Sequence, residues 1–174
     1  MNPDLQTPLP SALPYTDAKP VGAADFYFAI NATFRFLLNK LGVEGLRRYW
    51  TDLGTHYFAP VSAAWKQRGL PAVAAYWRAF FAAEPGAEVE VHQTADAVTI
   101  EVKVCPAFKH LRAHGREIVP CFCQHCYFLN EAIAAPAGLT ARVDGGNGSC
   151  RQTFVRRDTA VPPQDLNAIR EATC

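Results

Sequence analysis

Apolar residues in the first half of the chain recur with the period of an α-helix. Between about Ala23 and Gly42 they return every three or four positions, and the same spacing continues from about Glu44 to Pro60 and from Pro71 to Pro85. Three helices are therefore predicted, separated by a glycine and by prolines. Their expected buried faces are Phe26, Ile30, Phe34, Leu37 and Leu41; then Leu46, Trp50, Leu53 and Tyr57; then Val73, Trp77, Phe80 and Phe81.

Beyond Gly86 apolar and polar residues alternate, which is typical of strands with one wet face. Residues 88–92 and 98–104 predict one hairpin, and residues 139–143 and 150–154 predict a second. Between them we expect a short helix after Cys105 and a longer helix over about 120–135. The predicted fold class is α+β, with N-terminal helices packed on a small antiparallel sheet of two hairpins and a cysteine-rich helix between the hairpins.

The two ends of the chain differ in composition from its middle. Residues 1–20 contain five prolines, which predict an extended or disordered arm. Residues 21–158 are expected to form a single α+β domain, followed by a C-terminal tail over 159–174. An arm of this kind can pack on a second subunit, so association into a homo-oligomer is an alternative that the sequence leaves open.

Charge and hydropathy narrow the classes of partner. The net charge is +1 over 174 residues and the basic residues are scattered, so neither nucleic acid nor a membrane surface is an expected partner. No apolar stretch approaches the ~20 residues needed to span a bilayer, and the N-terminus lacks the features of a signal peptide. A cytoplasmic location is therefore predicted, where cysteines stay reduced and serve chemistry or metal binding.

Five of the six cysteines fall between Cys105 and Cys150. Cys105 precedes Pro106, so it is predicted to cap the N-terminus of a short helix. The helix dipole and the free N–H groups there would lower the pKa of a thiol and could hold a developing negative charge. The alternative is that Cys105 is a buried packing residue, since free cysteine behaves as a small hydrophobe.

The segment Cys121-Phe-Cys-Gln-His-Cys126 is the densest cluster. Cys123 and Cys126 share one helix face, while Cys121 and His125 share another. A Cys-x-x-Cys pair suits zinc, an iron–sulfur cluster or redox chemistry, but here it would have to borrow further ligands. Cys126 could instead pack in the core.

Other polar features have simpler interpretations. His110 and His114 are four apart, which fits either a metal pair or a solvated helix face. The glycine-rich segment 144–148 lacks the ending of a phosphate-binding loop and predicts a hairpin turn. Cys150 alternates in phase with Phe154, so both should face the same side of the sheet.

Several of these residues together resemble a known family. Cys105-Pro106, Gly115, the cysteine-rich helix start, Gly145-Gly-Asn-Gly-Ser-Cys150 and Phe154 resemble the L-2-amino-thiazoline-4-carboxylic acid hydrolase family, over roughly residues 25–156. The pattern is also similar to the vinyl-reductase-like small-molecule-binding domain. The first resemblance implies hydrolytic opening of a small ring.

Two functions of different class follow. The first is a hydrolase that opens a cyclic amidine or amide C–N bond of a thiazoline-carboxylate-like substrate, with Cys105 as thiolate nucleophile, His125 as acid or base, and Arg142 and Asn147 in substrate binding. No cofactor is expected for it. The alternative is a sensor or carrier that binds zinc, an iron–sulfur cluster or a small ligand through Cys105, Cys123, Cys126 and Cys150. A third interpretation is that the protein is a scaffold in which the cysteines only pack in the core.

Overall fold

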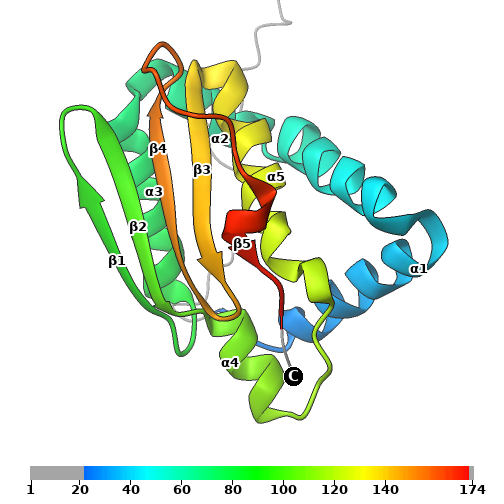
Figure 1. Cartoon of the computed structure of the whole chain (residues 1–174). Coiled ribbons are helices and arrows are strands. Elements are labelled where there is room, and N and C mark those ends of the chain that lie inside the picture. The colour runs from blue at the N-terminus through cyan, green and yellow to red at the C-terminus, as the bar shows by residue number, and fades with distance from the viewer. Residues whose placement is uncertain (1–21, 173–174) are drawn as a thin grey trace, which may run out of the picture.

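The N-terminal half of the chain is helical, as its periodicity predicts. The computed structural model describes residues 22–172, so the predicted arm over residues 1–20 and Cys174 lie outside the described residues. Helix α1 (Phe26–Asp52) is interrupted at Gly42, where φ is 68° and ψ is −178°. Only glycine adopts that conformation readily, so this position divides α1 into the two helices that the sequence predicts. In Figure 1 these two halves form a bent arm at one side of the molecule.

Two further helices follow α1, and prolines mark where they begin. A π-helical turn, Leu53–Tyr57, leads into α2 (Ala59–Arg68) and α3 (Leu70–Ala83), with Pro60 and Pro71 in their first turns. The expected buried faces are partly wrong, because four of their residues are exposed: Phe26 (65%), Leu41 (59%), Tyr57 (42%) and Phe80 (38%). Periodicity identifies a helix face, but it does not show how far the layer beneath that face extends.

The two predicted hairpins belong to one sheet. They are β1 (Glu88–Gln93) with β2 (Ala97–Val104), and β3 (Leu139–Gly146) with β4 (Ser149–Arg156). Strand β2 pairs antiparallel with β4, which joins the hairpins, and the strand order is β1-β2-β4-β3-β5.

The fifth strand corrects the prediction of two hairpins alone. Strand β5 (Ile169–Arg170), after the 3-10 turn Leu166–Ala168, lies in the predicted tail and pairs parallel with β3. A Cβ at Gly146 would lie 2.3 Å from the Arg170 carbonyl oxygen, so glycine at this position permits the pairing. Two residues are too few to show a period, and the sequence therefore gave no sign of this strand.

Helices cover one face of the sheet, giving the two layers of an α+β fold (Figure 1). Helix α3 packs on β1 and β2, and α5 (Gln124–Ala134) packs on β3. The short helix α4 (Pro106–Ala113) follows β2, a 3-10 turn (Pro120–Cys123) precedes α5, and a second 3-10 turn (Ala135–Ala137) ends it. Buried side chains form two clusters, one between the sheet and α2, α3 and α5, the other between α1, α4 and residues 118–122.

Close contact at Gly54 fixes the turn after α1 against α5. A Cβ at this position would lie 2.6 Å from the Leu129 carbonyl oxygen and 2.7 Å from the Ala132 Cβ. Neither neighbour is the mobile end of a side chain, so the two segments can approach this closely only because residue 54 is glycine.

Gly54→Ala is therefore expected to destabilise the fold by about 1–3 kcal/mol through overpacking, although alanine favours a helix. Urea denaturation followed by circular dichroism measures the change. The control is Thr55→Ala, an exposed neighbour on the same turn, which we expect to stay within about 0.5 kcal/mol of the parent. Equal stability of the two variants would show that the Gly54 contact carries no constraint.

Candidate functional site

A cavity of about 410 Å³ lies where the two buried clusters meet. This volume is in the ~300–1,000 Å³ range of small-molecule sites. Its walls come from both halves of α1, the turn after α1, α3, the β2–α4 junction, α5 and the β3–β4 turn. Most of the lining is aromatic or aliphatic, including Tyr27, Ile30, Phe34, Tyr49, Leu53, Phe58, Tyr76, Trp77, Phe80, Phe81, Val102, Phe108, Phe122, Leu129, Ile133 and Val143.

Four cysteines and a histidine also line this cavity. The structure brings together Cys105, Cys123, Cys126 and Cys150, which lie on four different elements or element ends, and His125. All four cysteines are free thiols. The cavity therefore presents nucleophilic sulfur atoms to any molecule that occupies it.

The turn between β3 and β4 ties these cysteines to one another. The backbone N–H of Cys105 donates to the Gly148 carbonyl (2.9 Å), and the N–H of Asn147 donates to Cys123 Sγ (3.3 Å). Cys150 follows two residues after Gly148 on β4. Positive φ angles at Gly145, Gly146, Asn147 and Gly148 give the turn its shape, and a Cβ at Gly148 would lie 3.1 Å from the Arg112 guanidinium.

Cys105 caps the N-terminus of α4, as Pro106 predicts. The N–H groups of Ala107 and Phe108 stabilise its thiolate, and Arg112 adds a favourable charge. The expectation of a lowered pKa is nevertheless wrong, because burial outweighs these effects and raises the pKa of Cys105 above its usual value. Cys105 is therefore a neutral thiol at neutral pH. The two N–H groups stabilise its anion, but by less than burial destabilises it.

The other three thiols are also held neutral. Burial raises the pKa of Cys123 to about 11 and that of Cys150 to about 12, and it raises that of Cys126 well above the usual range. Each of these sulfurs lies close enough to the others for their charges to repel, which opposes ionisation of more than one. The cavity is thus an uncharged, thiol-rich interior at neutral pH.

His125 lies in an aromatic environment. Its ring centroid is 5.2 Å from that of Phe34, 5.9 Å from that of Trp50 and 6.4 Å from that of Phe122. Burial lowers the pKa of His125 to about 4. The imidazole is consequently neutral at pH 7 and retains a lone pair that can accept a proton.

Two buried amides form a polar chain on the α5–β4 side of the cavity. Asn130 Nδ2 donates to Gln152 Oε1 (2.8 Å), and Gln152 Nε2 donates to Cys150 Sγ (3.6 Å). Asn130 Oδ1 is buried and has no hydrogen-bond partner among the described residues. Neither amide was predicted from the sequence, since a polar residue on the apolar face of a helix (Asn130) or a strand (Gln152) is visible from periodicity only as an exception to it.

The cavity has a second polar feature that sequence reasoning missed. The hydroxyl of Tyr27, which lines the cavity, donates to the carboxylate of Glu84. Burial and this carboxylate raise the pKa of Tyr27 far above its usual value, so the phenol keeps its proton. The pair joins the start of α1 to the end of α3, where Gly22 N–H also donates to the Ala83 carbonyl (2.7 Å). The 57-residue separation of Tyr27 and Glu84 left no local signal.

The structure does not bring the two predicted substrate-binding residues to the cavity lining. Arg142 donates to the carbonyls of Pro162 and Ala141 and to Thr140 Oγ1, at 2.7 Å each. Asn147 accepts from Arg112 through Oδ1 (2.5 Å) and positions Cys123 through its backbone. Residue type suggested ligand contacts, whereas strand register turns Arg142 away from the cavity and the turn geometry engages Asn147 with α4.

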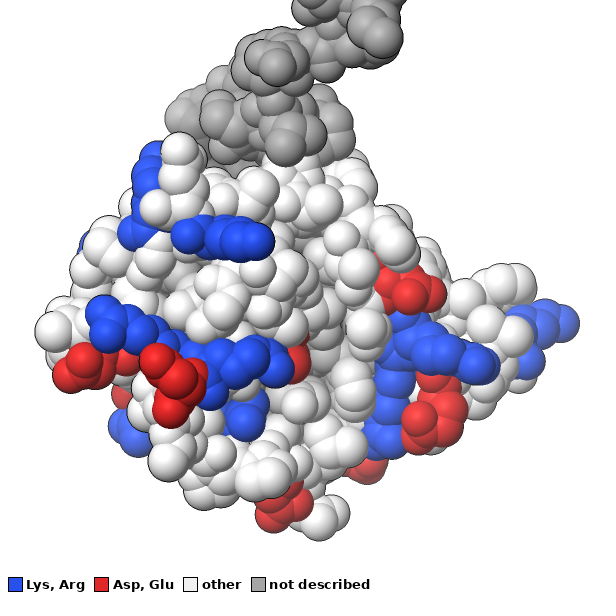
Figure 2. Space-filling model, turned by 90° about the horizontal axis from the view of Figure 1, so that it is seen from above, with Lys and Arg blue, Asp and Glu red and all other residues white. Residues whose placement is uncertain are grey.

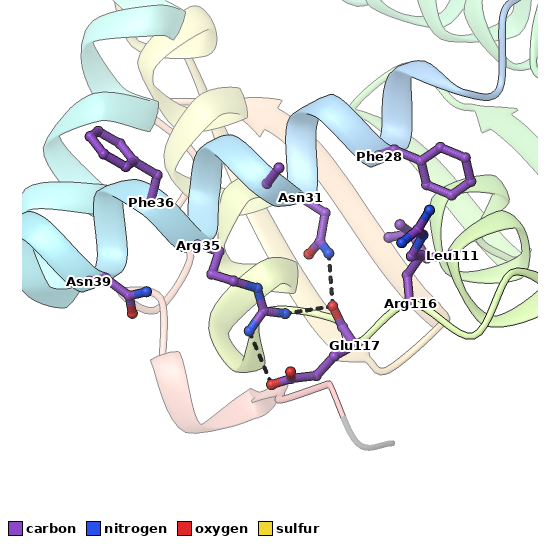
Figure 3. Close-up of a pocket in the computed structure, with 9 residues that line it drawn as sticks. Phe28, Asn31, Arg35, Phe36, Asn39, Leu111, Arg116 and Glu117 are labelled. Atoms are coloured by element: carbon purple, nitrogen blue, oxygen red, sulfur yellow. Dashed lines mark hydrogen bonds and ion pairs between the residues drawn. The ribbon is translucent and has the colours of Figure 1, made fainter.

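A second, more open hollow beside α1 holds the segment that leads into the cysteine-rich helix (Figure 3). Asn31 Nδ2 and Arg35 both donate to the Glu117 carbonyl, at 2.8 and 2.6 Å, and Arg35 also pairs with the Glu117 carboxylate (3.1 Å). Asn31 Oδ1 accepts the Val119 N–H (3.1 Å). These polar groups satisfy one another, so this hollow serves to fix the residues before Pro120.

Cys121 and the two remaining candidate histidines lie away from the cavity lining. Cys121 is buried in the cluster around α1 and α4. His110 lies 3.1 Å from an Asp25 carboxylate oxygen, and His114 Nδ1 lies 2.9 Å from the His110 carbonyl. Both rings pack on Phe28, which favours the interpretation of a structural helix face.

Within residues 22–172, no three His, Cys, Asp or Glu side chains lie close enough to one another to hold a metal ion. Over the same residues no helix is long and apolar enough to cross a membrane. Figure 2 shows basic and acidic side chains interspersed on the face that it presents, with uncharged residues between them.

The chain matches no protein-family model, no curated protein and no solved structure.

The lowered pKa of His125 predicts a loss of stability in acid. The unfolded chain takes up a proton near pH 6.5 and the folded chain only near pH 4. The stability from neutral His125 is thus complete above pH 6.5 and falls as the pH drops toward 4, by about 1.4 kcal/mol per unit and about 3 kcal/mol in all.

Urea denaturation at pH 7 and at pH 4 tests this difference. His125→Gln should lose less stability between the two pH values than the parent, by up to that amount. His92→Gln replaces an exposed histidine and is expected to follow the parent. A parallel fall in the parent and in His125→Gln would show that His125 titrates normally.

Proposed function

We propose that this protein is a small-molecule hydrolase that opens a cyclic amidine or amide C–N bond, with Cys105 as nucleophile. The observation that carries the proposal is the position of Cys105, which is the N-cap residue of α4, where the Phe108 and Ala107 N–H groups favour its thiolate, and which lines the cavity. The resemblance to the L-2-amino-thiazoline-4-carboxylic acid hydrolase family supports the same chemistry, since Cys105-Pro106, the Gly145–Cys150 segment and Phe154 carry it.

The proposed reaction begins with a neutral thiol. Cys105 Sγ adds to the ring carbon of the amidine or amide, and the thiol proton passes through neutral His125 to the ring nitrogen. The C–N bond then breaks, the nitrogen leaves as an amine, and the carbon stays bound to sulfur. Water adds to that carbon, the sulfur leaves and regains its proton, and the net change is the addition of one water to the opened ring.

Negative charge develops near Cys105 during this sequence. The N–H groups at the start of α4 are fixed by the helix and need no rearrangement, so they favour the transition state over the resting thiol. A raised resting pKa is compatible with this role, because ionisation is then coupled to attack on a bound substrate.

The location and partners proposed for the protein follow from the same site. A set of four free thiols around one cavity suits a reducing cytoplasmic compartment. We propose a small molecule as the partner and neither nucleic acid nor a membrane, in line with the mixed charge on the surface. A homo-oligomer stays a prediction.

Cys105→Ala is expected to abolish ring opening of L-2-amino-thiazoline-4-carboxylate or of the uncharged lactam oxindole, measured as the gain of one water by mass spectrometry, because the nucleophile is lost. Its melting temperature should stay within a few degrees of the parent. Cys121→Ala removes a cysteine that does not line the cavity and should keep the activity. Full activity of Cys105→Ala would remove Cys105 from the reaction.

A second candidate function rests on the number of thiols. Cys105, Cys123, Cys126 and Cys150 line a single cavity, and a carrier or sensor could use them to bind zinc or an iron–sulfur cluster. Zinc would require four ligands at about 2.3 Å from the ion for sulfur and about 2.0–2.1 Å for nitrogen, so the thiols would have to move together and ionise.

Metal measurement separates the two functions. If the carrier function holds, purified protein should contain about one zinc or iron centre per chain, and a chelator should lower the melting temperature clearly, because binding to the folded state alone adds to stability. Cys150→Ala should lose the metal, with Cys121→Ala as control. If protein reconstituted with zinc under reducing conditions retains none and melts unchanged, the carrier function is excluded for zinc.

A further inference from the structure

One residue of the cavity lining carries a buried hydrogen-bond acceptor that none of the described residues satisfies. Asn130 is 2% exposed and lines the cavity from α5. Its Nδ2 group is used by Gln152, while its Oδ1 has no partner among the described residues. A buried carbonyl oxygen left without a hydrogen bond destabilises the fold, so such an atom at a cavity favours a ligand that donates to it.

The orientation of Asn130 is set by a chain of contacts. Gln152 lies between Asn130 and Cys150, accepting from the first and donating to the second. Gln152 is itself 5% exposed and is held in β4 between β2 and β3. The Nδ2 donor of Asn130 is therefore already used in a hydrogen bond. The atom without a partner among the described residues is the acceptor Oδ1.

A matching donor lies on another wall. Trp77, on α3, is 8% exposed and lines the cavity, and its indole N–H is also buried without a hydrogen-bond partner among the described residues. A ligand that carries both an N–H and a carbonyl could donate to Asn130 Oδ1 and accept from the Trp77 indole N–H.

Charge limits the ligand further. Among the described residues that line the cavity there is no lysine, arginine, aspartate or glutamate. Burial raises the pKa of Tyr27 and of all four thiols that line the cavity and lowers that of His125, so these six groups are neutral at pH 7. Burying a carboxylate or an amidinium there would forfeit its hydration without a charged partner.

We propose that the cavity binds an uncharged cyclic amide that is largely apolar, whose ring N–H donates to Asn130 Oδ1. This inference rests on the proposed hydrolase and narrows its substrate class to lactams in preference to amidinium or carboxylate-bearing rings. Asn130 then selects for the ring N–H, and the thiol of Cys105 attacks the ring carbonyl carbon.

The test compares three related probes by calorimetric titration of the full-length Cys105→Ala protein, which binds without turnover. Oxindole is an apolar lactam, N-methyloxindole lacks its N–H, and oxindole-5-carboxylate adds a charge. Oxindole should bind about five- to tenfold more tightly than N-methyloxindole, the value of one hydrogen bond to a buried acceptor. The carboxylate should show no saturation at concentrations that saturate with oxindole.

A matched pair of variants assigns the preference to Asn130. Asn130→Leu should bring the affinity ratio of oxindole to N-methyloxindole to about one, whereas Asn39→Leu, an exposed asparagine of α1 outside the cavity lining, should leave it unchanged. If Asn130→Leu fails to fold, the ratio in the Cys105→Ala protein decides alone. Equal affinities for the two lactams there, or tight binding of the carboxylate, would overturn the inference.

The outcomes also separate this inference from the proposed function. Selective binding of oxindole without ring opening by the parent protein would support the ligand class and contradict the hydrolase. Ring opening of L-2-amino-thiazoline-4-carboxylate without binding of either lactam would support the hydrolase and contradict the ligand class.

Discussion

The backbone of the β3–β4 turn is the constraint on which the candidate site depends. Through Gly148 it accepts the N–H of Cys105, through Asn147 it donates to the sulfur of Cys123, and it delivers Cys150 on the next strand. Three cysteines from separate segments are thereby held by a single turn. Its run of positive φ angles is affordable only with glycine at most positions, which explains why a glycine-rich segment lies beside the thiols.

Burial then determines the chemistry of those thiols. An exposed cysteine at a helix N-terminus would be acidic, but here desolvation opposes the helix and the pKa of Cys105 rises. The same physical cause lowers the pKa of His125 to about 4. The site is consequently a neutral, apolar interior at pH 7, and this distinguishes it from a site with a permanently ionised thiolate.

The cavity lies where two separate buried clusters meet, one between the sheet and α2, α3 and α5, the other between α1, α4 and residues 118–122. Cys105 packs against both clusters, since β2 ends and α4 begins at that residue. The bend at Gly42 and the close contact at Gly54 hold α1 and the turn after it near α5, and the Asn31 and Arg35 contacts to Glu117 fix the segment before Pro120 (Figure 3). Together these contacts fix the positions of the elements that form the cavity walls.

The sequence by itself determined the local elements of this protein and hence its α+β class. The helix interrupted at Gly42, the helices that begin near Pro71 and Pro106, and the alternating strands all follow from contacts within a few residues, whereas α2, which begins where the sequence predicted a helix to end, was not predicted. It also indicated which cysteines to consider. Only the tertiary structure decided that the hairpins join through β2 and β4, that two tail residues add a fifth strand, and that Arg142 lies away from the cavity lining. It alone revealed Tyr27 with Glu84 and the unpaired oxygen of Asn130, because hydrogen bonding and desolvation depend on neighbours that are distant along the chain.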